Sequence, residues 1–370
     1  MIYFEDRLAS LKKRRQGTAE QDRLEKDICF YESTPRTTEV YEKLNEKAAI
    51  KYVIGSMAAV SQEYTKVSKD QGKEVASTLL YMLRISGINA EPRLQGSVAL
   101  DIHIEGHSDV DMLILKSDVI TFQNPALSRN YYSYSSGTRS MVDIVKELRL
   151  ESEAKLKSLY HAAEVNTSGA KSIALSGGDL RRKVDIVPSA WHDTHDYQIK
   201  KLEHFRAVRI YDKDNHALIE NKPFLHIKKV NDRDAQYNGN LKKVTRLMKN
   251  IIADMPDRKK SKAKSLTSYD IAAIAYSMNE SLYCSQYLPL MLLENLRSYL
   301  LNILHDNYER NSLIVPDGSR NIFNTNEKVE ALRILYNEVN ELAESVHKSI
   351  NPFKEKYDGG VLRNREVVFF

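Results

Sequence analysis

The first ninety residues of the chain repeat apolar side chains every three or four positions, a spacing that is typical of helices. From Thr37 to Lys66 the sequence has no proline, and the spacing predicts a single spine helix of about eight turns. A second helix is predicted from Gly72 to Ser86, and Gly87 suits its carboxyl-terminal cap. The more polar residues 1–36 are expected to form a separate helical arm.

After Glu91 the spacing changes to short apolar runs, which predict buried strands separated by turns. The predicted strands are residues 109–115, Ser172–Leu175 and Lys183–Val187. The last two are joined by Gly177-Gly178-Asp179, a composition that favours a hairpin turn. Met141–Tyr160 returns to helical spacing, whereas residues 117–139 are rich in Ser, Asn and Tyr and are expected to form a loop.

A second helical region is predicted from about Gly239 to the end of the chain, after a polar stretch that contains Pro223. The order of these elements predicts an α+β fold in which strands with flanking helices precede a helical lobe. The expected parts are an N-terminal arm over residues 1–36, a core lobe over residues 37–230 and a helical lobe over residues 231–370. The tail Leu362–Phe370 ends in Val-Val-Phe-Phe and docks either on the body of the protein or on another protein.

Composition and charge narrow the class of protein. The chain has 370 residues, of which 42% are hydrophobic, and a net charge of +5, which excludes disorder as its overall state. Cys29 and Cys284 lie far apart without a neighbouring cysteine, so neither a disulfide framework nor a zinc cluster is indicated. The N-terminus is charged from residue 5 onward, and nowhere do about 18 apolar residues follow one another. We therefore expect a cytoplasmic protein without a membrane partner.

Three aspartates and a Gly-Ser pair carry the strongest chemical signal. Asp109 and Asp111 alternate along a predicted strand, so both side chains point to the same face and repel each other. Asp185 lies in another predicted strand. If the two strands are neighbours, three carboxylates can hold two Mg²⁺ or Mn²⁺ ions of the kind that assist nucleotidyl transfer. Gly96 permits close approach of the backbone to a ligand, and the amide and hydroxyl of Ser97 can bind a phosphate oxygen.

Several segments together resemble one enzyme superfamily. LQGS, SDVDMLIL and RRKVDIVPSAW resemble the metal motif of DNA polymerase β-like nucleotidyltransferases, and Trp191 follows the third aspartate as it does there. Within that superfamily the chain most resembles the bacterial relatives of cyclic GMP-AMP synthase. These CD-NTases, or DncV-like nucleotidyltransferases, make cyclic oligonucleotide signals in anti-phage (CBASS) defence. The segments NKPFLHIKKVND, LKKVTRLMKN, LTSYDIAAIAY and LIVPDGSRNIF also fit, so the resemblance covers about residues 38–350.

The resemblance implies a polymerase β-like core, with a small mixed sheet and flanking helices, and a role for each matching residue in it. Asp109 and Asp111 would be ligands of both metal ions. Asp185 would be the third ligand and would help to deprotonate the attacking ribose hydroxyl. Gly96 and Ser97 would hold the triphosphate of the donor nucleotide.

Three residues of the helical lobe gain roles only from the resemblance. Lys249 and Ser268 match positions that contact the triphosphate, and Tyr269 matches a position that stacks on a nucleobase. Their surroundings in the sequence leave alternatives open. Lys249 shares with Arg246 the basic side of an apolar-striped helix over residues 241–253, which can equally be solvated. Ser268 can serve as the N-cap of a helix, and Tyr269 can belong to the core.

Two basic clusters have less specific signals. Residues 257–264, DRKKSKAK, can bind nucleic-acid phosphates, but without interleaved aromatic residues a solvated loop between helices is the favoured interpretation. Arg181-Arg182-Lys183 precedes Asp185 and is a candidate to face a nucleotide pocket. The chain has no His/Cys insertion like that of the animal enzyme, so neither stable zinc nor double-stranded DNA sensing is expected.

These observations lead to one expected activity and three alternatives. We expect a Mg²⁺-dependent nucleotidyltransferase, with Mn²⁺ as a substitute, that condenses NTPs into a cyclic di- or trinucleotide and releases pyrophosphate. ATP is an expected substrate, and a regulatory protein is one possible partner. The base of the second nucleotide and the linkage are left open by the sequence. The alternatives are a polymerase β-like enzyme with an RNA or protein acceptor, an enzyme that modifies a small molecule, and a nucleotide-binding or nucleic-acid-sensing module without catalysis.

Overall fold

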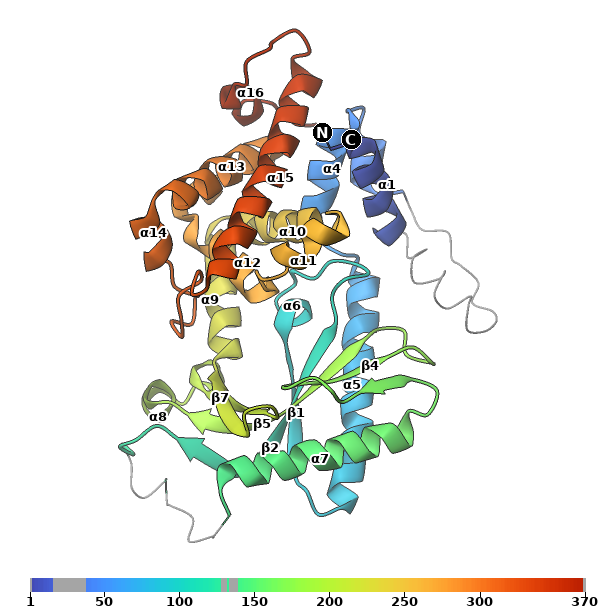
Figure 1. The fold of residues 1–370 in the computed structure, drawn as a ribbon, viewed down its shortest axis with the longest axis vertical. Coiled ribbons are helices and arrows are strands. Elements are labelled where there is room, and N and C mark those ends of the chain that lie inside the picture. The colour runs from blue at the N-terminus through green and yellow to red at the C-terminus, as the bar shows by residue number, and fades with distance from the viewer. Residues whose placement is uncertain (1, 16–37, 128–131, 133–138, 369–370) are drawn as a thin grey trace. The chain divides into compact units, whose positions relative to one another are not determined.

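The computed structural model describes residues 2–15, 38–127, 132 and 139–368 (Figure 1). Within these residues the chain forms two compact units. The sheet unit comprises Ser61–Leu100 and Ser108–Lys229, and the helical unit comprises Met1–Val60, Asp101–His107 and Val230–Phe370. Residues 38–60, which the sequence-based boundaries place in the core lobe, thus pack with the helical unit.

The sheet unit contains one seven-stranded mixed sheet among its described residues. Its strands are β1 (Ala90–Gln95), β2 (Val110–Phe122), β3 (Glu164–Asn166), β4 (Ile173–Ser176), β5 (Val184–Asp193), β6 (Ala207–Asp212) and β7 (Ala217–Asn221). Its helices are α5 (Gln62–Ile85), α6 (Gly96–Ala99), α7 (Met141–Leu159) and α8 (His195–Lys200). The strand order is β1-β2-β5-β4-β3, and β6 pairs with β5 and β7. β2 and β5 run parallel to each other within an otherwise antiparallel arrangement, which confirms the predicted α+β class with a small mixed sheet.

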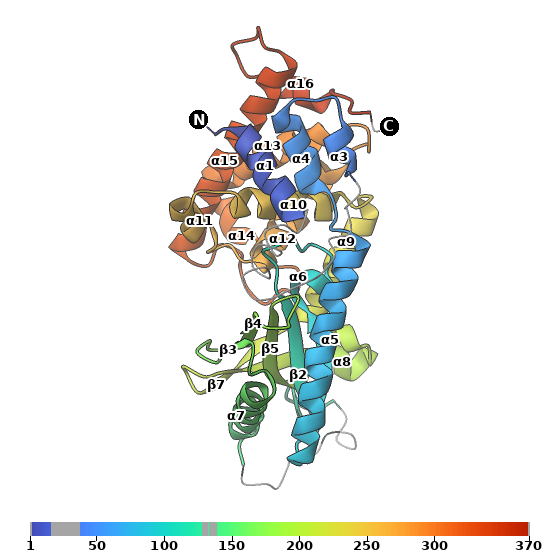
Figure 2. The same cartoon turned by 90° about the vertical axis from the view of Figure 1, so that its right-hand side faces the viewer.

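Side chains along β2 alternate between two faces of the sheet. Val110, Met112 and Ile114 are buried on one face, in a core that includes α5 and α7. Figures 1 and 2 show both helices running along the sheet. Leu113 and Leu115 point to the other face, where they belong to a second apolar cluster. β2 is therefore buried on both sides over this stretch, as its unbroken apolar run requires.

The long helix of the N-terminal region lies later in the chain than predicted. The single spine helix expected over Thr37–Lys66 is wrong, because the backbone leaves helical geometry at Leu44 and again at Ala58. The helices found there are α3 (Val40–Lys43) and α4 (Ala48–Met57). α5 then starts after Ser61, whose hydroxyl caps it by accepting a backbone N–H, and continues for 24 residues. Its predicted end is confirmed, since Gly87 follows with a φ of +77°.

The predicted strands are present but extend further than their apolar runs. Residues 109–115, 172–175 and 183–187 fall in or next to β2, β4 and β5, and the hairpin between the last two is confirmed by antiparallel pairing. β2 continues beyond an irregularity between Lys116 and Ile120 into the segment expected to be a loop, because it pairs there with Trp191–Asp193. The sequence pattern does not predict β1, β3, β6 or β7, whose segments are short or polar. It also misses α9 (Pro223–Gln236), since helices were expected only from about Gly239. Met141–Tyr160 is confirmed as α7.

The helical unit is built around α10. Its further helices are α1 (Phe4–Arg15), α11 (Asp257–Ala263), α12 (Ser268–Ser277), α13 (Pro289–His305), α14 (Asn307–Ser312), α15 (Asn326–Ile350) and α16 (Gly359–Arg363). α10 (Asn240–Ala253) contacts α4, α12 and α15, and of its 14 residues only Lys242 and Lys243 are not buried. Within the described residues, no helix is long and apolar enough to cross a membrane.

Helix α1, which belongs to the predicted N-terminal arm, docks on the helical unit through three buried arginines. Arg7 pairs with Glu338 at 2.7 Å, Arg14 with Asp254, and Arg15 with Glu39 at 2.8 Å. Each arginine thus neutralises a carboxylate from a different segment, which fixes the helix by charge as well as by apolar contact. Residues 16–37, which complete the arm and include Cys29, lie outside the described residues.

The C-terminal tail docks on the body of the protein as far as Val367, which is the first of the two alternatives that the sequence left open. Leu362 and Val367 are buried. The N–H of Val367 donates to the carbonyl of Tyr287 at 2.9 Å, and Arg365 pairs with Glu46 at 2.7 Å. The final Phe-Phe lies outside the described residues.

Gly72 allows α5 to approach β2 closely. A Cβ atom at this position would lie 2.6 Å from Cγ1 of Val110, well inside contact distance. We expect Gly72→Ala to lower the free energy of unfolding by about 1 kcal/mol, because overpacking outweighs the gain in helix propensity. Urea denaturation followed by circular dichroism measures the change. Ser77→Ala, at an exposed position of the same helix, should stay within about 0.5 kcal/mol of the wild type, and an unchanged or more stable Gly72→Ala protein would contradict the close packing.

Candidate active site

Two neighbouring parallel strands bring the three predicted aspartates together. Asp109 immediately precedes β2, Asp111 lies on β2, and Asp185 lies on β5. In the register of this pair Asp111 stands beside Asp185. The N–H of Val110 donates to the carbonyl of Lys183 at 3.0 Å, so Lys183 lies next to the peptide bond that joins Asp109 to Val110. The strands that carry Asp111 and Asp185 are therefore neighbours, as the predicted metal site requires.

The carboxylates share the face of the sheet opposite α5 and α7. Val110, Val184 and Ile186 alternate with the acidic positions and are fully buried in the core that contains these helices. Because successive residues of a strand point to opposite faces, Asp111 and Asp185 point away from that core. Both side chains remain partly exposed, so solvent or a ligand can reach them.

Burial and mutual repulsion change the pKa of one of the three carboxylates. The pKa of Asp185 is raised from 3.8 to about 6, first because burial disfavours its charged form and next because the charge of Asp109 repels it. The charge of Lys183 opposes this shift. A hard divalent cation, which prefers carboxylate oxygens, would relieve the same repulsion.

The donor chemistry therefore fits a divalent cation, but the ligand geometry is not preformed. Among the described residues, no three His, Cys, Asp or Glu side chains are arranged so that they could hold a metal ion as they stand. Metal ligation by Asp109, Asp111 and Asp185 thus stays a prediction, based on their shared face and their repulsion.

Gly96 touches this acidic group directly. It opens α6 with a φ of +74°, a conformation that residues with a Cβ atom rarely adopt. A Cβ atom there would lie 2.8 Å from Cγ of Asp111 and would collide with the carboxylate itself. Ser97, the next residue, is buried. Gly96 therefore lies against the acidic cluster, and only a residue without a Cβ atom leaves room for the Asp111 carboxylate.

In the helical unit, the basic side predicted for α10 is largely covered. Lys249 and Arg246 are buried, contrary to a solvated face. Arg246 donates from Nε to the carbonyl of Met57 and from Nη1 to the carbonyl of Asp101, each at 2.9 Å. Its guanidinium group thus satisfies buried carbonyls, because the neighbouring segments enclose the helix on this side as well.

Ser268 is the first residue of α12 and not its cap. Thr267 occupies the cap: its hydroxyl accepts the N–H of Asp270, while the Asp270 carboxylate accepts the N–H of Thr267 at 3.1 Å. The alternative that Ser268 serves as the N-cap is therefore wrong. Its partly exposed hydroxyl is left to other roles, and contact with a triphosphate stays a prediction.

Tyr269 is held by a residue that the sequence did not single out. Its hydroxyl donates to Oδ2 of Asp317 at 2.6 Å, and Arg320 lies 5.8 Å from the centre of its ring. Burial, followed by the charge of Asp317, raises the pKa of the Tyr269 hydroxyl. The signal that could have identified Asp317 is the turn-forming Pro-Asp-Gly in the segment LIVPDGSRNIF. Stacking of the ring on a base is not tested by these contacts.

The basic cluster of residues 257–264 is a short helix, α11, and not the expected loop. Lys259 of this helix pairs with Glu338 of α15 at 2.7 Å. Glu338 also binds Arg7 of α1, so part of the positive charge of the cluster is already neutralised within the helical unit. This pairing weakens the nucleic-acid interpretation of the cluster.

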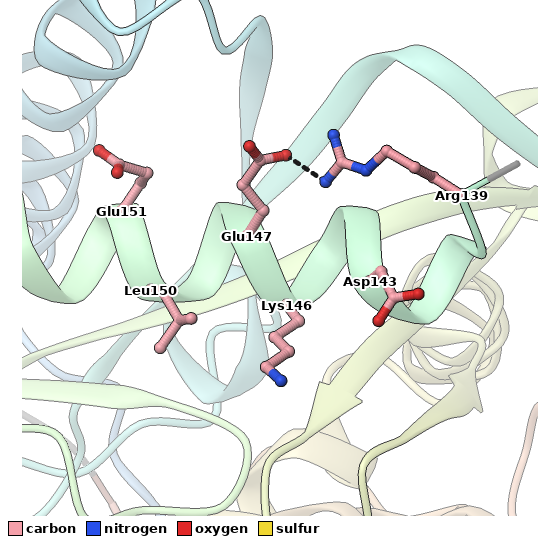
Figure 3. Close-up of a pocket in the computed structure, with 6 residues that line it drawn as sticks. All are labelled: Arg139, Asp143, Lys146, Glu147, Leu150 and Glu151. Atoms are coloured by element: carbon pink, nitrogen blue, oxygen red, sulfur yellow. Dashed lines mark hydrogen bonds and ion pairs between the residues drawn. The ribbon is translucent and has the colours of Figure 1, made fainter. Parts of the chain in front are cut away.

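A surface pocket of about 250 Å³ lies along α7 (Figure 3). It is lined by Arg139, Asp143, Lys146, Glu147, Leu150 and Glu151. Figure 3 shows that five of these side chains lie along α7, while Arg139 lies just before the helix and pairs with Glu147. Binding sites for small molecules are usually built from several elements that enclose the ligand. This pocket also contains none of the predicted site residues, so it is not our candidate for the nucleotide site.

Comparison of this chain with known proteins identifies its family. Residues 228–345 match the family model described as the cGAS/DncV-like nucleotidyltransferase C-terminal helical domain. The cyclic dinucleotide synthase CdnE of Yersinia aleksiciae is 36% identical over 367 residues, which cover 94% of this chain and 93% of that protein. The c-di-GMP synthase of Lachnospiraceae bacterium is 31% identical and covers 82% of this chain and 88% of that protein.

A solved structure supports the same assignment. The STING-associated CdnE c-di-GMP synthase from Capnocytophaga granulosa superposes with a TM-score of 0.68 and 27% identity. The match covers 93% of this chain and 99% of that one. The fold, the acidic strand pair and these similarities define a cGAS/DncV-like nucleotidyltransferase, that is, an enzyme of the CD-NTase family. Within that family the chain belongs with the CdnE cyclic dinucleotide synthases.

We predict that Gly96→Ala reduces pyrophosphate release from nucleoside triphosphates by about 100-fold or more, because the new methyl group displaces the Asp111 carboxylate. Gly177→Ala is the matched control: Gly177 has a φ of +75° and open space around its Cβ position. Both variants carry the backbone strain of about 1 kcal/mol, but only the first carries the collision. A coupled pyrophosphate assay and a thermal melt of each variant make the comparison. Equal activity of the two variants would show that the contact with Asp111 is unimportant.

Proposed function

We propose that the protein condenses two nucleoside triphosphates into a cyclic dinucleotide in a reaction that depends on Mg²⁺, for which Mn²⁺ can substitute. The observation that carries this proposal is the parallel register that sets Asp111 beside Asp185, with Asp109 at the end of the same face. An acidic group on one sheet face, next to a Gly-Ser turn, suits a polyphosphate substrate with divalent cations.

Each residue of the sheet unit has a defined part in the proposed reaction. Divalent cations bound by Asp109, Asp111 and Asp185 would offset the negative charge that develops on the transferred phosphoryl group. Asp185 would also accept, at a carboxylate oxygen, the proton of the attacking ribose hydroxyl. Gly96 keeps the space beside Asp111 open, and the amide and hydroxyl of Ser97 would bind an oxygen of the donor triphosphate.

The bond changes follow from this arrangement. The ribose oxygen of one nucleotide forms a bond to the α-phosphorus of the other, and the bond between that phosphorus and the oxygen of the β-phosphate breaks. Pyrophosphate leaves with the electron pair, and a second transfer of the same kind closes the ring. Lys249 and Ser268 of the helical unit are proposed to contact the triphosphate, and Tyr269 is proposed to stack on a base.

The named relatives support a dinucleotide rather than a trinucleotide product. The Yersinia aleksiciae relative is named a cyclic dinucleotide synthase, and relatives that are 31% and 32% identical are named c-di-GMP synthases. A Staphylococcus schleiferi relative, 23% identical, is named a cyclic GMP-AMP synthase. We therefore propose GTP as one substrate, and ATP stays a prediction for the other position.

The proposed role of the product is a signal in anti-phage defence, read by a receptor protein. The Capnocytophaga granulosa enzyme is described as STING-associated, which supports a STING-like receptor as the class of downstream partner. The alternative of an RNA or protein acceptor receives no support from the named relatives and becomes an outcome of the test below.

The test incubates the pure protein with all four NTPs and Mg²⁺ or Mn²⁺, followed by phosphatase treatment and mass spectrometry. A phosphatase-resistant cyclic dinucleotide is expected, and its mass identifies the bases. Release of pyrophosphate only when RNA or a protein acceptor is added would replace the proposal by its alternative. A linear product alone would contradict ring closure.

Replacement of the acids tests their role directly. We expect Asp109→Asn, Asp111→Asn and Asp185→Asn each to reduce product formation by about 100-fold or more, because each removes a charge that the cations need. Asp179→Asn, at an exposed acid in the neighbouring hairpin, is the control and should retain activity. Melting temperatures separate loss of function from loss of fold. Near-normal turnover in any of the three variants would remove that residue from the proposed site.

Substitutions of Tyr269 separate ring stacking from hydrogen bonding. Tyr269→Ala should raise the KM for nucleotide about tenfold, because stacking on a base contributes about 1–3 kcal/mol. Tyr269→Phe should keep the KM but lower the free energy of unfolding by about 1–2 kcal/mol, because Asp317 loses its donor. Tyr308→Ala, at a tyrosine that is 88% exposed, is the control. An unchanged KM in Tyr269→Ala would refute the stacking role.

A further inference from the structure

Lys183 lies beside the cluster of three aspartates. Its carbonyl accepts the N–H of Val110 at 3.0 Å, so Lys183 lies next to the peptide bond that joins Asp109 to Val110. Lys183 immediately precedes β5 and lies two residues before Asp185. Alternation along the strand, continued by this one residue, places the two side chains on the same face of the sheet. Val184, between them, is fully buried on the other face. The ammonium group of Lys183 therefore extends from the face that carries the carboxylates.

The two preceding arginines do not share this position. Arg181 and Arg182 lie in a bend before β5. The guanidinium group of Arg182 stacks on the ring of Tyr64 at 3.7 Å, and the N–H of Arg181 donates to Oε1 of Gln71 at 3.0 Å. These contacts tie the bend to α5. Of the three basic residues that the sequence offered for the nucleotide pocket, only Lys183 has a backbone hydrogen bond to the strand that carries Asp111.

The surroundings of Lys183 leave its ammonium group available. Its side chain is exposed, and among the described residues it forms no hydrogen bond or ion pair. It nonetheless lies close enough to Asp185 for the two opposite charges to attract each other. A flexible lysine beside an acidic cluster serves well as a mobile positive charge for a phosphate group.

The negative charge of the triphosphate substrate calls for a positively charged side chain in addition to the cations. Two divalent cations carry four positive charges and three carboxylates carry three negative ones, so the loaded site would have little positive charge left for a triphosphate. A lysine on the same face would supply a further positive charge.

We propose that Lys183 is a substrate-binding residue whose ammonium group binds a phosphate of a nucleoside triphosphate held at the Asp109–Asp111–Asp185 face. The inference rests on the proposed function, because it takes a nucleotide as the ligand of that face. It goes beyond the metal motif, since it assigns a phosphate contact to the residue two positions before the third aspartate.

The test compares Lys183→Met with Lys183→Arg in the full-length protein. Isothermal titration with a non-hydrolysable GTP or ATP analogue and Mg²⁺ gives the Kd, and the pyrophosphate assay gives KM and kcat. We expect Lys183→Met to raise Kd and KM about tenfold and to leave kcat at saturating nucleotide nearly unchanged. Lys183→Arg, which keeps the charge, should restore most of the affinity. Lys157→Met, at an exposed lysine on α7, is the control and should bind as the wild type does.

Each other result overturns the proposal. Wild-type affinity in Lys183→Met, or a loss of kcat without a change in KM, would exclude a phosphate contact. Equal losses in both variants with lowered melting temperatures would indicate a structural role. The proposed function fails separately: if the wild type binds the analogue through Lys183 but makes no cyclic product, the contact stands and the activity does not. If the wild type binds neither analogue, both fall.

Discussion

The parallel pairing of β2 with β5 is the constraint on which the site depends. One register buries Val110 and Val184 in the core and places Asp111 beside Asp185 on the opposite face. A slip by one residue would bring the carboxylates into the core and the valines to the surface, so apolar burial strongly disfavours any other register. The apolar burial that stabilises the core thus also holds mutually repelling carboxylates side by side.

Two glycines let the surrounding backbone come close to β2. Gly72 of α5 lies against Val110 on the core face, and Gly96 lies against the carboxylate of Asp111 at the end of β1. In both places a single methyl group would collide with the strand. The packing of α5 on one face of β2 and the room for the Asp111 carboxylate on the other therefore depend on residues without a side chain. This requirement explains why a Gly-Ser turn accompanies the acidic motif.

The helical unit shows the limits of an amphipathic pattern. The alternation along α10 predicts a basic face, but further segments of the unit cover that face and bury Arg246 and Lys249. Arg246 is tolerated there because two backbone carbonyls satisfy its guanidinium group. In the same way Tyr269 is oriented by Asp317, a residue 48 positions away along the chain. Residues that resemble phosphate ligands can thus have structural partners that only the fold supplies.

The sequence by itself determined the α+β class, the apolar cores of β2 and β5, and the acidic residues at their starts, because hydrophobic runs and alternation are local properties of a strand. It placed the long helix wrongly, since a cap at Ser61 and breaks at Leu44 and Ala58 override an apolar spacing that continues across them. Only the tertiary structure decided which strands are neighbours, that the carbonyl of Lys183 pairs with the N–H of Val110, and that Arg246 is buried. Those outcomes depend on pairing and packing between segments distant in the chain, which no local pattern encodes.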